Sequence, residues 1–212
     1  MLALAKGRAL LLREEFREHA MTNHIPAPSR LPPLSADSYD QAQKDAQADF
    51  VATRKVGFSG PWHVFIRSPE LLTHAQRMGE YLRYRCKLSG RISEFVILLV
   101  ARDWTQDYEF GTHRNHGLKA GLTEAIIEAV RDGRRPEGLD EELSIIWDFV
   151  TELLRARRVS DTSYGRALAR FGEQGIIDLA GIIGYYSLLA MTMNVARVSP
   201  PDGESYLPRF PE

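Results

Sequence analysis

Residues 91–121 read RISEFVILLVARDWTQDYEFGTHRNHGLKAG, and this stretch decides the fold. The run Glu94–Arg102 is apolar on almost every face apart from its two ends, which predicts a buried helix capped by Ser93 or a neighbour. A second helix is predicted from about Asp107 to Lys119. A turn through Trp104–Gln106 would fold the two helices into an antiparallel hairpin.

Helical patterns continue on both sides of this hairpin. We find no convincing strand alternation and no repeat at a fixed solenoid period, so the sequence predicts an all-α fold. The further helices that we expect cover Ser38–Lys55, a run from Pro69 through Lys87, a short helix beginning at Thr123, Glu141–Arg157, and about Gly175–Val198.

The last predicted helix is long and apolar enough to reach the transmembrane range. However, Asp178 lies within it, Gly181 and Gly184 allow close helix packing, and no clusters of lysine and arginine flank it. We therefore expect a central core helix, placed at a subunit interface or inside the chain.

The expected organisation has four parts: an N-terminal extension over residues 1–20, an arm plus helix over 21–60, a helical domain over 61–200 and a tail over 201–212. The extension carries Lys6 and Arg8 within its apolar part, which argues against a signal peptide. It is either an amphipathic helix or the product of a start assigned upstream of Met21. Prolines make residues 24–35 an extended arm.

Composition limits the classes of function. The formal net charge is −1, which argues against a nucleic-acid partner. Cys86 is the single cysteine, so an intrachain disulfide, a CxxC redox pair and a multi-thiolate zinc site are excluded. A lone thiol fits a reducing compartment, and we expect a cytoplasmic protein with no membrane partner.

The candidate chemistry lies in three residues of the hairpin. Glu109 and His113 are four residues apart and share one helix face, while Glu94 lies in the preceding apolar helix. Carboxylates beside an imidazole shift one another's pKa values and are suited to proton transfer. The structural alternative is a solvated Glu–His pair, with Glu94 serving only as a buried partner of Arg91 or Arg102.

A metal site is a second alternative. Glu94, Glu109, His113 and His116 offer acceptable oxygen and nitrogen ligands, and helical bundles build metal sites in this way. Their spacing does not reproduce the paired Glu-x-x-His motifs of di-iron proteins, so we predict neither a metal nor another cofactor.

Three motifs resemble the carboxymuconolactone decarboxylase and alkylhydroperoxidase-D superfamily: RxSEFVILLVA, then YEFxxH, then a helix that begins GLTEAI. The resemblance covers residues 60–133 well and the C-terminal helices loosely. Glu94 and His113 match the glutamate and histidine of the hydroperoxidase branch, but Gln106 and Glu109 occupy its two cysteine positions. Glu109, Phe110 and His113 match the Glu-Phe-x-x-His segment of the decarboxylase branch.

The resemblance implies an alkylhydroperoxidase-D-like helical bundle that forms a homotrimer or homohexamer. It implies a cofactor-free lyase acting on a small carboxylated lactone or ring acid. Because Gln106 and Glu109 stand in place of the two cysteines, we predict no thiol peroxidase activity. His113, Glu109 and Glu94 would be catalytic, with His113 handling the proton. Candidate substrate-binding residues, including three arginines for the substrate carboxylate, are Tyr108, Gln106, Arg91, Arg102, Arg114 and His116.

Two other functions remain open at this point. One is a thiol-independent oxidoreductase or metal-assisted enzyme that uses the same pocket. The other is a non-catalytic member, structural or ligand-binding, whose polar residues only satisfy one another. A pocket without room for a ligand beside His113 would favour it. Trp62, His63 and Phe65 could line the pocket mouth, but we expect Trp62 and Phe65 to belong to the core.

Overall fold

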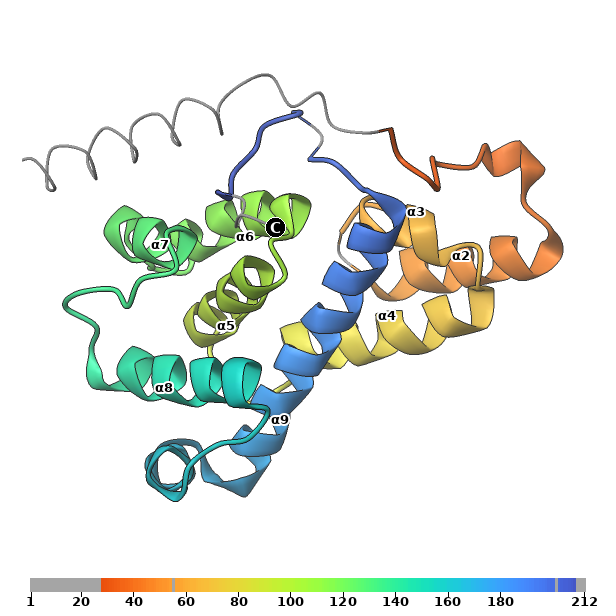
Figure 1. Ribbon diagram of the computed structural model, residues 1–212. Helices are drawn as coiled ribbons and strands as arrows, with labels where there is room; N and C mark the ends of the chain where they lie inside the picture. The colour runs from red at the N-terminus through yellow and green to blue at the C-terminus, as the bar shows by residue number, and fades with distance from the viewer. Residues whose placement is uncertain (1–27, 55, 201, 209–212) are drawn as a thin grey trace, which may run out of the picture.

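The computed structural model describes residues 28–54, 56–200 and 202–208, and every regular element in those ranges is helical (Figure 1). This confirms the predicted all-α class. The elements are the short 3₁₀ helix η1 (Ala36–Ser38) and the α-helices α2 (Gln41–Thr53), α3 (Pro61–Phe65), α4 (Pro69–Tyr84), α5 (Gly90–Asp103), α6 (Asp107–Lys119), α7 (Glu124–Arg131), α8 (Glu141–Ala156) and α9 (Asp161–Ala196).

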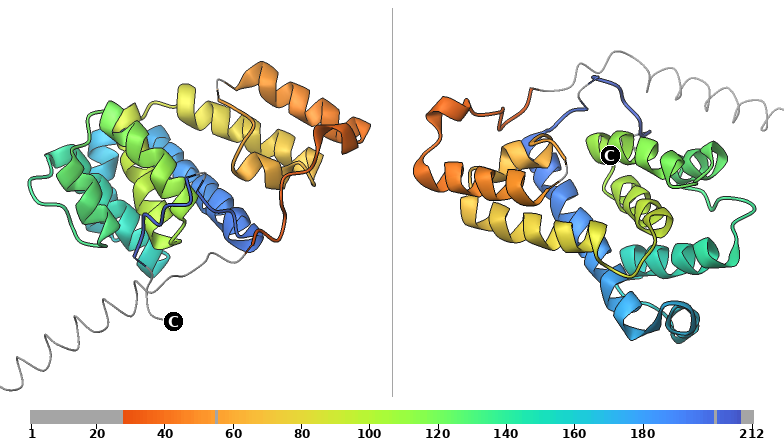
Figure 2. Two further views of the ribbon diagram at one scale, coloured as in Figure 1. Left: turned by 90° about the horizontal axis from the view of Figure 1, so that it is seen from above. Right: turned by 180° about the vertical axis from the view of Figure 1, so that it is seen from behind.

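The long helix α9 crosses the molecule and organises its packing. It packs against α3, α4, α5 and α8. Figure 2 shows α2 and α4 on one side of α9 and α5 to α8 on the other. Every residue from Ile92 to Arg102 in α5 is buried, as the apolar run predicted. The α5–α6 hairpin turns through Trp104–Gln106, so residues 91–121 form the predicted helical pair at the centre of the fold.

Two predicted helix starts were wrong by a few residues. Ser89, and not Ser93, caps α5, since its hydroxyl accepts a hydrogen bond from the backbone N–H of Ile92 at 3.3 Å. Helix α2 begins at Gln41, and not at Ser38, because Asp40 forms a capping box with Gln43. Both caps follow the preference for a short side-chain acceptor directly before the first helical residue.

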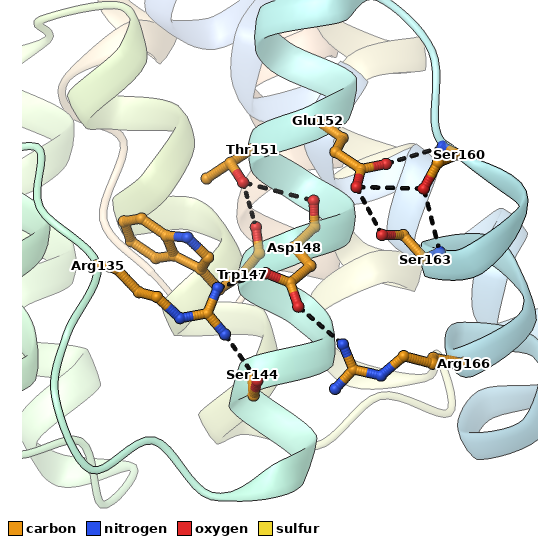
Figure 3. Close-up of polar contacts among 9 residues, drawn as sticks. All are labelled: Arg135, Ser144, Trp147, Asp148, Thr151, Glu152, Ser160, Ser163 and Arg166. Carbon is orange, nitrogen blue, oxygen red and sulfur yellow. Dashed lines mark hydrogen bonds and ion pairs between the residues drawn. The ribbon is translucent and has the colours of Figure 1, made fainter.

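The predicted last helix corresponds to the main segment of α9, which follows a break at Gly172, close to the predicted start near Gly175. The largest omission is the first segment of α9, which begins at Asp161 and is capped by Ser160. Gly172 has φ 69° and ψ 175°, so the first segment turns away from the second. Figure 3 shows how α8 holds this first segment. Asp148 accepts from Arg166 at 2.8 Å and also binds Arg135. Exposed charged side chains in this first segment interrupt the apolar periodicity from which a helix is predicted.

The main segment of α9 is partly buried. Asp178 accepts a hydrogen bond from the Tyr81 hydroxyl at 2.9 Å, which satisfies a charge inside the apolar helix. Gly181 permits close packing, because a Cβ atom there would lie 3.2 Å from Leu82. Gly184 makes no such close contact with the described residues, since a Cβ atom there would meet nothing within 4 Å. By length and composition α9 could cross a membrane, and 56% of its most apolar window is buried.

Both ends of the described chain lie against helices. The non-helical segment 28–35 is extended as predicted, and Ser29 Oγ donates to the Ala196 carbonyl at 3.0 Å. In the tail, the backbone N–H groups of Tyr206 and Leu207 donate to Asp107 at 3.0 and 2.8 Å. The expectations for residues 1–20, 24–27 and the start at Met21 lie outside the described residues.

Candidate active site

The hairpin brings Glu94 and His113 together. Glu94 Oε2 lies 2.5 Å from His113 Nδ1, and the two residues are 6% and 7% exposed. Glu94 lies ten residues before Trp104 and His113 seven residues after Gln106, so folding back through the turn brings them near each other. A buried carboxylate needs a polar partner, and this short hydrogen bond to His113 supplies one for Glu94.

Two further residues complete this cluster, and the sequence analysis missed both. Arg83 at the end of α4 donates to Glu94 Oε1 at 3.2 Å and to the Tyr186 hydroxyl at 2.9 Å. The Tyr186 ring packs edge-on against His113 with centroids 5.2 Å apart. Arg83 lies 11 residues before Glu94, and no sequence pattern around it indicates that the two side chains meet. The Tyr185–Tyr186 pair in an apolar helix was a usable signal, because buried tyrosine hydroxyls need polar partners.

The protonation states follow from burial and neighbouring charges. Complete burial lowers the pKa of His113, and the Glu94 carboxylate opposes this without reversing it. Burial acts to raise the pKa of Glu94, but His113 and Arg83 together hold it below its usual value. At pH 7 we therefore assign an ionised Glu94 and a neutral His113. Nδ1–H then donates to Glu94, which leaves the lone pair on Nε2.

Tyr186 and Arg83 keep their protons in this cluster. Burial raises the pKa of Tyr186 to about 12, although Arg83 opposes the shift. Burial acts to lower the pKa of Arg83, but Tyr186 and Glu94 raise it above its usual value. Tyr186 therefore remains a hydrogen-bond donor at neutral pH, and Arg83 remains a cation that offsets the Glu94 charge.

Glu109 is also buried, but it does not join His113. Neither of its carboxyl oxygens has a hydrogen-bond partner among the residues that the structure describes. Burial raises the pKa of Glu109 well above the usual value, which favours the neutral acid over the carboxylate. The Glu109 carboxyl group also acts to raise the pKa values of Tyr185 and Tyr186. Their four-residue spacing predicted that Glu109 and His113 would pair. That pair does not form, and Nδ1 of His113 contacts Glu94 instead.

A small cavity of about 30 Å³ lies beside the cluster. Its polar lining comes from Arg83, Ser93, Glu94 and Tyr186, and Gly90 lies at its edge. This volume is sufficient for a water molecule or a ligand atom group of similar size. A whole ring acid needs more room, so binding one would require the side chains around this opening to move.

Two of the predicted substrate-binding residues have structural roles. The Gln106 side chain caps α6 by accepting from the backbone N–H of Tyr108 at 2.7 Å, and it donates to Asn194 at 2.9 Å. The Tyr108 ring packs over Gly60, where a Cβ atom would lie 2.5 Å from the ring. His116 is the member of this set nearest to the cluster, with its ring centroid 5.6 Å from that of His113.

The three predicted arginines do not form a clamp beside His113. Arg91 pairs with Asp140 at 2.6 Å, and Arg114 pairs with Glu124 at 2.7 Å. Arg102 is buried at the other end of α5, eight residues beyond the buried carboxylate, or about 12 Å along the helix axis. The arginine that reaches the cluster is Arg83, which comes from a different helix.

The remaining candidates pack as expected for core residues. Trp62 and Phe65 are buried, which confirms their predicted place in the core. His63 is half-buried, and burial lowers its pKa. Cys86 is half-buried, donates to the Leu82 carbonyl at 2.9 Å, and has its pKa raised by burial, so its thiolate is disfavoured.

Within residues 28–54, 56–200 and 202–208, no group of three or more His, Cys, Asp or Glu side chains is arranged to hold a metal ion. The residues proposed as an alternative metal set instead form a hydrogen-bonded pair, an unpaired acid and a neighbouring histidine. Comparison of the chain with protein-family models finds no match, and no curated protein is similar to it in sequence.

Proposed function

We propose that this chain is a cofactor-free lyase of the carboxymuconolactone decarboxylase type, acting on a small carboxylated lactone or ring acid by general acid/base chemistry. The observation that supports it most strongly is the buried 2.5 Å contact between Glu94 and His113 beside a polar cavity. Perturbed carboxylate and imidazole groups in such a position are suited to proton transfer near neutral pH.

The proposed mechanism uses His113 as the proton-handling residue. Its Nε2 accepts or returns a proton, while the ionised Glu94 fixes the tautomer through Nδ1 and stabilises the imidazolium as it forms. Loss of carbon dioxide from an unsaturated lactone leaves a dienolate, which needs a hydrogen-bond donor at oxygen and a proton at carbon. Tyr186 is the donor that lines the cavity. His113 is not among the lining residues but contacts two of them, Glu94 and Tyr186, so it would supply the proton once the side chains around the opening have moved.

Arg83 takes the place of the predicted arginine clamp in this proposal. It lines the cavity with Glu94 and is the cation nearest to a bound substrate there. Its Nε atom is buried and has no hydrogen-bond partner among the described residues, so it retains a donor for a substrate carboxylate.

We further propose a cytoplasmic homo-oligomer of three or six chains that has no nucleic-acid or membrane partner. The single cysteine supports the cytoplasmic location, and the near-neutral charge supports the absence of a nucleic-acid partner. The exposed apolar residues of α9 support assembly, because a helix that is apolar on most faces requires burial on most faces.

One observation favours a second candidate, a non-catalytic member of the same fold. The cavity beside Glu94 has the size of a water molecule. In that case Arg83, Glu94, His113 and Tyr186 would serve only to satisfy one another inside the core. The two candidates differ in whether any small acid binds at the cluster.

A panel of lactones and ring acids, assayed for release of carbon dioxide, tests the proposal. With a substrate found, His113→Ala should lower kcat by roughly 10²- to 10⁴-fold, with helicity and assembly unchanged. Glu94→Gln should lower the rate or shift the pH profile. The control is His74→Ala, because the His74 side chain is 73% exposed. An active His113→Ala enzyme, or a panel without binding or turnover, would favour the non-catalytic candidate.

A further inference from the structure

One face of α9 between Ile177 and Val195 is apolar, exposed and uncharged. Ile177 is 70% exposed, Val195 63% and Met191 40%. Asp178 is the one charged residue between Gly175 and Ala196, and it is buried. This face lies apart from the buried cluster, since Tyr186 is directed into the core.

The exposed positions form a single stripe. We define the α9 stripe as Ile177, Gly181, Gly184, Leu188, Met191 and Val195, which are exposed or half-buried. At about 100° per residue these six positions fall within an arc of roughly 80°, and the stripe is about 27 Å long. A long apolar face of this kind on a helix of a soluble chain indicates an interaction surface.

The stripe is symmetric about the level of Tyr186. Ile177 and Val195 lie nine residues before and after it, Gly181 and Met191 five, and Gly184 and Leu188 two. A twofold axis at this level would place Leu188 of one chain over Gly184 of its partner and Met191 over Gly181. Leu188 and Met191 would then each meet a glycine and Ile177 would meet Val195, a reciprocal pattern of the kind that an isologous interface requires.

Gly184 is open on this surface. A Cβ atom there would meet nothing within 4 Å, although Gly181 one turn earlier is in contact with Leu82 of α4. No packing contact among the described residues therefore explains the absence of a side chain at Gly184, and a glycine in a helix interior costs stability relative to alanine. Close approach of a second helix would account for it.

The available area is suitable for a second copy. Helix α4 borders the stripe through Leu82. With about 100 Å² for each large apolar side chain, the four large side chains of the stripe supply roughly 400 Å². A specific interface buries about 800 Å² per partner, so a flanking rim would have to supply the other half.

We propose that α9 pairs with α9 of a second copy of this chain, antiparallel and about a twofold axis level with Tyr186. The pairing is independent of the proposed activity, because no stripe residue belongs to the cluster around His113. It requires an even number of chains, so of the two assemblies proposed above it selects the hexamer and excludes the isolated trimer.

The first test measures the mass of the full-length chain by light scattering at micromolar concentration. Gly184→Leu should weaken assembly roughly tenfold or more, because the new side chain meets the partner's Leu188, while far-UV circular dichroism is unchanged. Gly165→Leu is the matched control, since a Cβ atom at Gly165 also meets nothing within 4 Å. A monomeric parent chain, or one that binds phosphatidylcholine vesicles as a monomer, contradicts the pairing.

The second test examines the orientation of the two helices by cross-linking in a Cys86→Ser background. A mixture of Ile177→Cys chains and Val195→Cys chains should form cross-linked dimers, because the axis brings these positions together. Either variant alone should not, since the two copies of one position would lie about 27 Å apart along the helix. Cross-linking of Ile177→Cys with itself would overturn the antiparallel arrangement.

Discussion

Two polar clusters hold helices together in this molecule, and they differ in burial. The cluster around Glu94 joins α4, α5, α6 and α9, and the Glu94 and His113 side chains are 8% and 9% exposed. The cluster around Asp148 joins α8 to the loop before it and to α9, and Arg135 and Arg166 are 45% and 41% exposed (Figure 3).

The difference shows what burial adds to the same kinds of side chain. Water screens the Asp148 cluster, and such exposed pairs contribute about 0–1 kcal/mol each to stability. In the buried cluster each charge depends on its protein partner, and removing one partner leaves an uncompensated charge. In the buried cluster, burial lowers the pKa of His113 and a cavity adjoins Glu94, which is why we assign the chemistry there.

The largest effect is expected from Glu94→Ala. This change leaves Arg83 buried without its carboxylate, and breaking a buried pair costs about 3–5 kcal/mol of unfolding free energy. Urea denaturation measures it. Glu124→Ala is the control, because the Glu124 side chain is 56% exposed in its pair with Arg114. If Glu94→Ala lowers the unfolding free energy by less than about 1 kcal/mol, the buried cluster stabilises the fold no more than the exposed one. Adding Arg83→Met should recover part of the loss, since both charges are then absent.

Two glycines, one buried and one exposed, give the next comparison. Gly79→Ala should destabilise the chain by about 1–3 kcal/mol, because a Cβ atom there would overlap the Tyr185 hydroxyl and lie 2.7 Å from Arg54 Nη1. Gly165→Ala, in the exposed first segment of α9, should stabilise by up to about 1 kcal/mol. Thermal denaturation of the two variants compares them directly. Equal effects would contradict tight packing at Gly79.

A pH-dependent effect is expected from Glu109→Gln. Because the pKa of Glu109 is raised by burial, the folded chain keeps a proton that the unfolded chain releases above about pH 4.3. The cost to stability therefore grows as the pH rises above that value and is absent below it. Glu109→Gln should exceed the parent in stability at pH 8, and the difference should close near pH 4. Parallel curves of unfolding free energy against pH would show that Glu109 is not a buried neutral acid.

The smallest effect is expected from Asp148→Ala. Its two arginine partners are exposed, so we expect a loss of about 1 kcal/mol or less that shrinks further in high salt. Denaturation at low and high ionic strength measures this. A loss above about 3 kcal/mol would mean that the exposed cluster behaves like a buried one.

The sequence predicted the α5–α6 hairpin because its signals are local. The apolar run in α5, the polar turn and the four-residue spacing of Glu109 and His113 can each be recognised within a short window. The first segment of α9 was missed, since Arg166 and Arg170 alternate there with small residues and Gly172 interrupts the periodicity. Helix starts were displaced because several serines and aspartates compete as caps.

The partners of the site residues could be predicted only in part. Burial of Glu94 required a polar partner, and the hairpin supplied His113. Arg83 comes from α4 and Tyr186 from α9, and no local pattern relates either residue to Glu94. The predicted clamp of Arg91, Arg102 and Arg114 failed for the same reason, because sequence proximity to Glu94 does not determine which helix face an arginine occupies.

The most direct test of the central assignment is ¹⁵N NMR of the His113 ring across the pH range, with the signals identified by their loss in His113→Gln. The account predicts a neutral ring at pH 7, protonated on Nδ1 and unprotonated on Nε2, that titrates below the ordinary histidine value of about 6.5. An imidazolium at pH 7, or a neutral ring protonated on Nε2, would contradict the assignment of His113 as a base oriented by Glu94.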